Sequence, residues 1–322
     1  MKKISIYLLV VILLAGITGC SDWLDVNQDP NNLTTSTKDL VLTGAQKQFA
    51  ERQQIGAGFS LLGAWTGYYA HSGGWSGWTN VKSYNMTASD YNGFFNDPYR
   101  AELKNLKYVE DKAWEVQNMA YVAMSRLLTA VTYQRMVDTY GDIPYSQGVE
   151  GFNGNVTPVY DDAQEIYDDL IVQIDTAILL FNEAIASANE IEAGADIIGH
   201  GDIDEWLKLA NTFKLRVLMR QTEARESYVT ANMKFDAAGF ITESVTATHG
   251  YIADTEGKMN PLYETYGRYF DGVLTNANQQ YVLNVFLLDL YTKSADPRLG
   301  FNWVPGVNTG DYSHGVKLGI NS

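Results

Sequence analysis

The sequence predicts a mainly α-helical fold with long irregular loops and little β structure. Apolar residues recur every three or four positions through several long stretches, as they do on the buried face of a helix. Asn, Asp, Pro and Gly stand at the ends of these stretches, where helix caps and breaks are expected. No repeat of fixed period is visible, so the residues alone do not predict a regular solenoid.

The first two helices are predicted from their cap signals. Thr37 can cap a helix through residues 38–53, which we expect to continue, interrupted by glycines, as far as Tyr69. Asp97 followed by Pro98 has the pattern of an N-cap and a first helical position. This pair therefore predicts that the second helix begins there.

The next two helices carry the clearest apolar pattern. Residues 116–140 form the first, which ends at Gly141 because Gly is favoured just past a helix C-terminus and Pro144 prevents continuation. Pro158 and Asp161 are expected to open the second. Its apolar stripe consists of Ile166, Leu170, Ile174, Ile178, Phe181 and Ile185.

The second half of the chain gives weaker signals. Asp202 is expected to cap a helix that turns Trp206 toward the core. A shorter helix is predicted near 227–237, and a last one over 278–291. Between them, alternation of apolar and polar residues over 244–254 indicates a short strand.

Composition and the N-terminus limit the possible functions. The chain carries a formal net charge of −15, and because nucleic-acid binding needs a cationic surface, nucleic acid is not expected as a partner. Lys2 and Lys3 precede an apolar run over 4–19, which is typical of a secretory signal peptide. That run is short for a membrane span, which needs ~20 residues. An uncleaved membrane anchor is the alternative interpretation.

Cys20 directly follows this run. The residues Ile17-Thr18-Gly19-Cys20 look like a bacterial lipobox, in which the Cys is lipidated, for example with palmitate, and becomes the new N-terminus. Cys20 is the chain's only cysteine, so it cannot form an internal disulfide. We expect a signal peptide over 1–19, a lipidated tether over 20–36 and a helical domain over 37–322.

The stretch GAWTGYYAHSGGWSGWTN, residues 63–80, combines aromatic rings with glycines. Glycines weaken a helix interior, and flexible linkers lack large rings, so neither a plain helix nor a linker is predicted. Exposed rings on a backbone that bends freely can receive the apolar face of a sugar. We place such contacts on Trp75 and Trp78, with Asn80 and Tyr84 as edge partners. Packing against the body of the protein, or contact with a protein partner, is the alternative.

Other aromatic residues divide between the two interpretations. Trp65, Tyr68 and Tyr69 have helical spacing from the leucines that precede them, so we expect them in the core. The tyrosines of 263–269 are expected to fill the core of a loop, with the lining of a groove as the alternative. Trp303 stands in a second loop and is a further candidate for ligand contact.

No catalytic or metal-binding motif stands out. The patterns His-Glu-x-x-His and Gly-x-Ser-x-Gly and the phosphate-binding loop are missing from the sequence. Adjacent carboxylates such as Asp161 and Asp162 splay around a helix, whereas a glycosidase needs two acids that face each other across a cleft. Arg298 is expected to fork onto a carboxylate and hold the end of the last helix. We predict no catalytic residue, no cofactor and no metal.

Several segments together resemble the SusD/RagB family of outer-membrane nutrient-binding lipoproteins. They are SDWLD after the lipobox Cys, NQDPNN in the tether, residues 120–146 ending in YGDIPYS, residues 157–181, ANTFKLRVL after Trp206, and ADPRLGF at 295–301. The helix that ends in YGDIPY is the most specific of these, and the likeness spans nearly the whole chain.

The resemblance implies a SusD-like fold of tetratricopeptide-like helix pairs. It also implies a lipid-anchored protein on the outside of the outer membrane, which passes an oligosaccharide or peptide ligand to a SusC-like TonB-dependent β-barrel transporter. A surface glycoside hydrolase and a lid subunit that binds peptide or no ligand are the alternatives. Family members usually continue well beyond this length, so the resemblance also implies that the domain is incomplete at its C-terminus.

Overall fold

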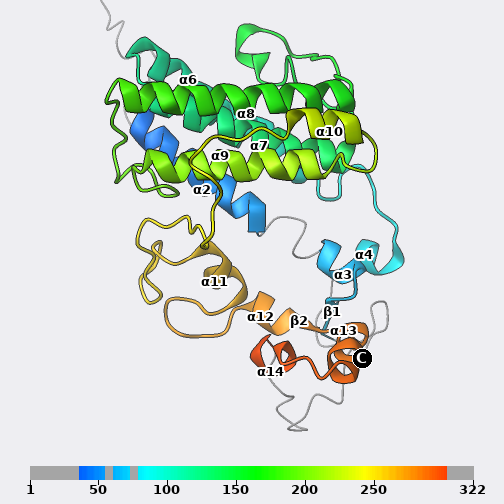
Figure 1. The fold of residues 1–322 in the computed structure, drawn as a ribbon. Helices are drawn as coiled ribbons and strands as arrows, with labels where there is room; N and C mark the ends of the chain where they lie inside the picture. The colour runs from blue at the N-terminus through cyan, green and yellow to red at the C-terminus, as the bar shows by residue number, and fades with distance from the viewer. Residues whose placement is uncertain (1–35, 55–60, 73–78, 303–322) are drawn as a thin grey trace, which may run out of the picture. The chain divides into compact units, whose positions relative to one another are not determined.

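Five long helices form the body of the protein, and each packs against the next along the chain (Figure 1). The computed structural model describes residues 36–54, 61–72 and 79–302, and the fold is that of the compact unit 38–322. The five are α2 (Lys38–Gln54), α6 (Lys104–Glu115), α7 (Met119–Tyr140), α8 (Ala163–Ala186) and α9 (Ile203–Met219). The mainly α-helical prediction is therefore confirmed.

Helix α7 lies at the centre of the core. Sixteen of its 22 residues are buried, and the helix contacts α6, α8 and α9. A helix that is apolar on all sides can be accommodated only where other helices surround it. Each large side chain buried there contributes about 1.5–3 kcal/mol of transfer free energy, so α7 carries much of the stability of the body.

The caps of the central helices set where they begin and end. The Asp202 carboxylate accepts from the backbone N–H groups of Asp204 and Glu205, which confirms it as the cap of α9. Gly141 follows α7 with φ +74°, a conformation that favours glycine, so the predicted end of α7 is also confirmed. Asn118 accepts from the N–H of Tyr121 and caps the start of α7.

The predicted start of α8 at Asp161 is wrong by one residue. Asp162 is the cap and accepts from the N–H groups of Gln164 and Glu165. The Asp161 carboxylate instead accepts from the N–H groups of Tyr145 and Ser146 at 2.8 Å. The Asp161 carboxylate therefore makes a tertiary contact and does not cap the helix.

The predicted helix start at Asp97 is also wrong. Helix α5 (Gly93–Asp97) runs into a π-helical stretch, η3 (Pro98–Leu103), which continues into α6. Asp97 has helical dihedral angles, and its carboxylate pairs with Arg52 at 2.7 Å and Arg100 at 2.6 Å. The wider π-helical turn accommodates a proline that has no N–H to donate.

Two segments far apart in sequence form the only sheet of the described residues. Strand β1 (Tyr69–His71) pairs antiparallel with β2 (Tyr281–Leu283), in the register Tyr69 with Leu283 and His71 with Tyr281. The expected continuation of the first helix to Tyr69 is therefore wrong, because α2 ends at Gln54 and Tyr69 is in a strand. Strand β2 also interrupts the helix predicted over 278–291, which is divided into α12 (Asn276–Gln280) and α13 (Val285–Lys293).

The remaining elements are short. They are α3 (Gly63–Trp65), α4 (Thr79–Ser83), η4 (Glu150–Asn153), α10 (Glu226–Asn232), α11 (Pro261–Tyr266) and α14 (Arg298–Asn302). Helix α10 is shorter than the predicted 227–237. Residues 244–254 contain no strand, which corrects that prediction. The N–H groups of Thr248 and Ile252 make single hydrogen bonds to the carbonyls of Ile197 and Lys258, two different segments, so no ladder forms.

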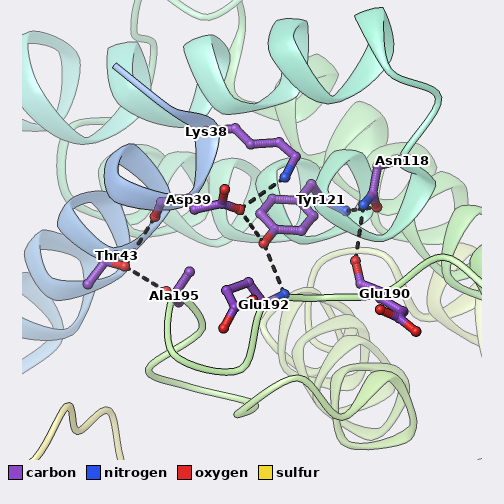
Figure 2. A network of polar contacts seen from close by, with 8 residues as sticks. All are labelled: Lys38, Asp39, Thr43, Asn118, Tyr121, Glu190, Glu192 and Ala195. Carbon is purple, nitrogen blue, oxygen red and sulfur yellow. Dashed lines mark hydrogen bonds and ion pairs between the residues drawn. The ribbon is translucent and has the colours of Figure 1, made fainter.

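A polar network ties the start of α2 to the loop between α8 and α9 (Figure 2). The Asp39 carboxylate accepts from the Tyr121 hydroxyl at 2.6 Å and from Lys38 Nζ at 3.0 Å, and the Tyr121 hydroxyl accepts from the Glu192 N–H at 3.1 Å. Burial raises the pKa of Asp39, but these hydrogen bonds outweigh burial, and the pKa lies below its usual value. Thr43 completes the network with a hydrogen bond to the carbonyl of Ala195 at 2.8 Å.

The Asp196 carboxylate is the most heavily bonded group of that loop. It is fully buried and accepts from two side chains, Gln46 Nε2 at 2.9 Å and Trp206 Nε1 at 2.8 Å. Three backbone N–H groups of the loop complete the set, those of Ile198, Gly199 and Gly201. One carboxylate thus joins α2, α9 and the loop that links α8 to α9.

We expect Asp196→Asn to destabilise the protein by about 2–4 kcal/mol. The amide nitrogen replaces one carboxylate oxygen and cannot accept from the donors that bond it, which are three at Oδ1 and two at Oδ2. Chemical denaturation, followed by circular dichroism, measures the loss. Asp254→Asn, at an exposed site, is the matched control and should change stability by less than about 0.5 kcal/mol. Equal effects of the two substitutions would contradict the role assigned to Asp196.

Candidate ligand-binding site

Two aromatic rings stack on each other close to the sheet. Trp65 at the end of α3 and Tyr84 just after α4 have ring centroids 5.4 Å apart and an interplanar angle of 28°. The Trp65 indole N–H donates to the carbonyl of Val81 at 3.0 Å, which holds the indole in place. Tyr84 has φ +55°, so the chain turns sharply at the point where this ring is presented.

The stacked pair forms one side of an open pocket of about 330 Å³. The pocket is lined by Ala64, Trp65, Thr66, Gly67, Tyr84, Asn284 and Phe286. A space of this volume lies in the range of small-molecule sites, which are mostly apolar with a few polar groups. The arrangement can therefore hold a ring-shaped ligand against aromatic surfaces.

Another part of the pocket lining comes from the start of α13, more than 200 residues further along the chain. Asn284 follows β2, and its N–H donates to the carbonyl of Tyr68 at 3.3 Å. Its side-chain oxygen accepts from the N–H of Phe286 at 2.9 Å and so caps α13. The sheet and this cap together bring Phe286 to the pocket that Trp65 also lines.

Glycines allow the rings to lie directly against the backbone. A Cβ atom at Gly67 would lie 2.8 Å from the Phe286 ring, and Gly67 has φ +79°. A Cβ atom at Gly63 would lie 2.5 Å from the Tyr69 ring. Any larger residue at these positions would displace a ring, which explains why this stretch needs both glycines and aromatics.

The rings of the pocket are unusually exposed for their size. The exposed fraction is 65% for Tyr84, 61% for Phe286, 50% for the neighbouring Tyr68 and 37% for Trp65. Clustered exposed aromatic residues mark ligand or partner sites in soluble proteins, because their contact with water is unfavourable. The cluster is thus the best candidate site among the described residues.

The expectation that Trp65 and Tyr68 belong to the core is therefore wrong. Helical spacing from the preceding leucines suggested burial, but α3 is only three residues long and does not continue that spacing. Tyr69 is partly buried against Tyr281 across the sheet and is not part of the hydrophobic core either. In the sequence, the flanking residues Gly63 and Gly67 are the feature that indicates a break in the helix at Trp65.

The structure gives different roles to the predicted site residues. Tyr84 lines the pocket, whereas the Asn80 amide donates to both oxygens of Asp90 at 3.1 Å and holds the turn that follows α4. Hydrogen bonds from the Thr87 hydroxyl and N–H, and then from Asn80, hold the pKa of Asp90 below its usual value. The predicted contacts Trp75, Trp78 and Trp303, and the lipidation site Cys20, lie outside the described residues.

Two further predictions have opposite outcomes. Arg298 does fork onto a carboxylate, because its Nε and Nη2 atoms donate to Asp296 at 3.0 and 2.5 Å. This fork is the principal cause that lowers the pKa of Asp296 to about 2. The tyrosines of 263–269 divide: Tyr263 and Tyr269 do not fill a loop core, since they are 42% and 41% exposed, whereas Tyr266 is partly buried and packs edge-on against Tyr281.

Membrane spans and metal-binding clusters are both absent from the described residues. None of the helices there is both long and apolar enough to cross a bilayer. The same residues contain no group of three or more His, Cys, Asp or Glu side chains that could hold a metal ion.

With the helical body and the aromatic pocket described, the comparisons identify the family of the chain. Residues 30–322 match the SusD-like family that is described as starch-binding and associating with the outer membrane. The chain belongs to this family. No match was found among curated proteins.

Solved structures with the same fold come from several bacteria. A SusD homologue from Bacteroides uniformis is 23% identical, with a TM-score of 0.68, over 87% of this chain and 58% of its own. A SusD/RagB family protein from Bacteroides thetaiotaomicron is 21% identical, with a TM-score of 0.65, over 82% and 53%. A chitin-binding SusD homologue from Flavobacterium johnsoniae is 20% identical, with a TM-score of 0.63, over 87% and 56%.

These likenesses establish the fold, and the SusD-like prediction is confirmed. The chain spans little more than half the length of the structures that it matches.

We expect Gly67→Ala to destabilise the protein by about 1–2 kcal/mol, because the new methyl group meets the Phe286 ring and a positive φ strains any L-residue. Gly44→Ala, in α2 with open space around it, is the control and should stabilise the protein by up to about 1 kcal/mol. Thermal and denaturant unfolding of both variants measures the difference. Stabilisation by Gly67→Ala would disprove the described packing of Phe286.

Proposed function

We propose that the chain is a cell-surface, nutrient-binding lipoprotein that captures a glycan and passes it to a SusC-like TonB-dependent transporter. The observation that carries this proposal is the pocket of exposed rings around Trp65, Tyr84 and Phe286. A sugar ring presents polarised C–H groups on its face, and an aromatic ring offers an apolar surface with a negative face to receive them. The starch-binding description of the family and the chitin-binding relative support a glycan over a peptide.

The proposed contact residues extend beyond the described pocket. Trp75 and Trp78 precede α4, the helix that presents Tyr84, and we propose that they extend the aromatic surface. Trp303 directly follows α14 and is proposed as a further contact. Tyr84 is the predicted contact that the pocket geometry supports, and we add Trp65 and Phe286 to it.

We propose binding without catalysis. The pocket lining contains no carboxylate, whereas glycoside hydrolysis ordinarily needs two that flank the scissile bond. The Asp90 carboxylate nearby is occupied by Thr87 and Asn80. Release of new reducing ends from oligosaccharides by the purified protein would favour the alternative, a surface glycoside hydrolase.

We expect Trp65→Ala and Tyr84→Ala each to weaken glycan binding at least tenfold, which corresponds to about 1.4 kcal/mol. Isothermal calorimetry with soluble polysaccharides provides the measurement. Tyr160→Ala is a matched control, because Tyr160 is 64% exposed and Tyr84 is 65% exposed, and Tyr160 lies in the loop before α8.

Three results of that experiment carry different meanings. Loss of binding in the two pocket variants, but not in the control, supports the proposal. Unchanged binding in all three would remove the pocket from the glycan site. Binding of no glycan by the unaltered protein would favour the lid-subunit alternative.

The anchor is tested separately. We expect Cys20→Ser to abolish labelling of the protein by an alkyne analogue of palmitate and to move it from the membrane to the soluble fraction, because Cys20 is the only thiol of the chain. Labelling and fractionation in a bacterium that makes lipoproteins measure both effects. Persistent membrane association of the variant would point instead to an uncleaved N-terminal anchor.

A further inference from the structure

Two of the three stretches that line the aromatic pocket contain no charged residue, and the third holds Tyr84, two residues after Lys82. Residues 53–81 contain no Asp, Glu, Lys or Arg, and neither do residues 272–288, although these four types make up 19% of the chain. Both segments carry exposed side chains, including Tyr68 and Phe286. Exposed surface is ordinarily where charged residues gather, so a surface site without them has an unusual composition.

The polar side chains of the pocket lining are already engaged within the protein. The Thr66 hydroxyl donates to the carbonyl of Leu62 at 2.6 Å, and the Trp65 indole N–H donates to Val81. The Asn284 amide is shared between the Tyr69 carbonyl and the N–H of Phe286. Of the polar side chains that line the pocket, only the Tyr84 hydroxyl makes no hydrogen bond to the part of the chain that the structure describes.

Charges near the pocket do not supply a partner for an anion. Arg298 is forked onto Asp296. Lys82 lies two residues before Tyr84 but does not line the pocket, and it has an interaction of its own. The Asp90 carboxylate of the turn after α4 repels anions, as does the chain's net charge of −15.

We infer that the Trp65–Tyr84–Phe286 pocket selects uncharged sugar rings and excludes sugars that carry a carboxylate or sulfate. This inference rests on the proposed glycan-binding function and names its ligand class. A charged group that enters such a site loses its hydration and gains no cation. The side-chain donors left to it are the Tyr84 hydroxyl and the second N–H of the Asn284 amide, whose first N–H bonds the Tyr69 carbonyl. A neutral ring keeps its hydroxyl groups in water at its edge and places its apolar face on the aromatic rings.

The test compares one polysaccharide in two chemical forms. A neutral polysaccharide that the protein binds is oxidised at its primary alcohols to give uronate on the same backbone, and calorimetry measures both forms in 0.05 M and 0.5 M NaCl. We expect at least tenfold weaker binding of the oxidised form at both salt concentrations. Repulsion by the net charge is screened at high salt, whereas exclusion by the pocket itself persists.

A substitution that adds a cation to the pocket should allow it to bind the oxidised, anionic polysaccharide. Thr66 is exposed and lines the pocket, so Thr66→Arg places a guanidinium there. This variant should bind the oxidised polymer at least tenfold more tightly than the unaltered protein does. Thr66→Gln adds a polar side chain without charge and should not.

The outcomes separate this inference from the proposed function. If the unaltered protein binds the neutral and the oxidised polysaccharide equally, and Tyr84→Ala binds neither, selection for neutral sugars is overturned while the glycan site stands. A difference that disappears in 0.5 M NaCl, with no gain in Thr66→Arg, would assign selection to net charge and also overturn it. If no polysaccharide binds in either form, the proposed function fails and the inference fails with it.

Discussion

The helical body depends on the buried carboxylate of Asp196. A charge without a cation beside it is unfavourable in a protein interior unless hydrogen-bond donors surround it. In this protein five N–H groups do so, from α2, from α9 and from the loop that links α8 to α9. The carboxylate thus fixes three elements relative to one another, and Asp39 and Tyr121 add a second link between α2 and the same loop.

The pocket depends on a different constraint, the pairing of β1 with β2. The ladder is three residues long, and it is continued by Asn284, which caps α13 and reaches back to Tyr69, 215 residues earlier in the chain. A ladder this short stabilises little by itself, so the aromatic contacts of Tyr69 with Tyr281 and of Gly67 with Phe286 must support it. The site is therefore a product of tertiary packing and not of one continuous motif.

The exposed aromatic rings of the pocket and the absence of charge from its lining can be explained together. Water-exposed rings are unfavourable for an isolated protein, and a charge beside them would improve solubility. The pocket has neither buried its rings nor acquired charges in its lining. A neutral ligand with an apolar face and polar edges matches such a surface, which is why the glycan proposal and the exclusion of anions follow from the same residues.

The sequence by itself determined the helical body, because helix signals act over three or four residues. The cap at Asp202, the end of α7 at Gly141 and the family motifs could all be read in that way. Only the tertiary structure decided which aromatics line a pocket. Trp65 has the spacing of a core residue, but it is exposed because α3 is only three residues long, and the chain then forms a strand whose partner lies more than 200 residues further along. Local patterns carry no information about that partner, and the same limit explains why Asp162, and not Asp161, caps α8.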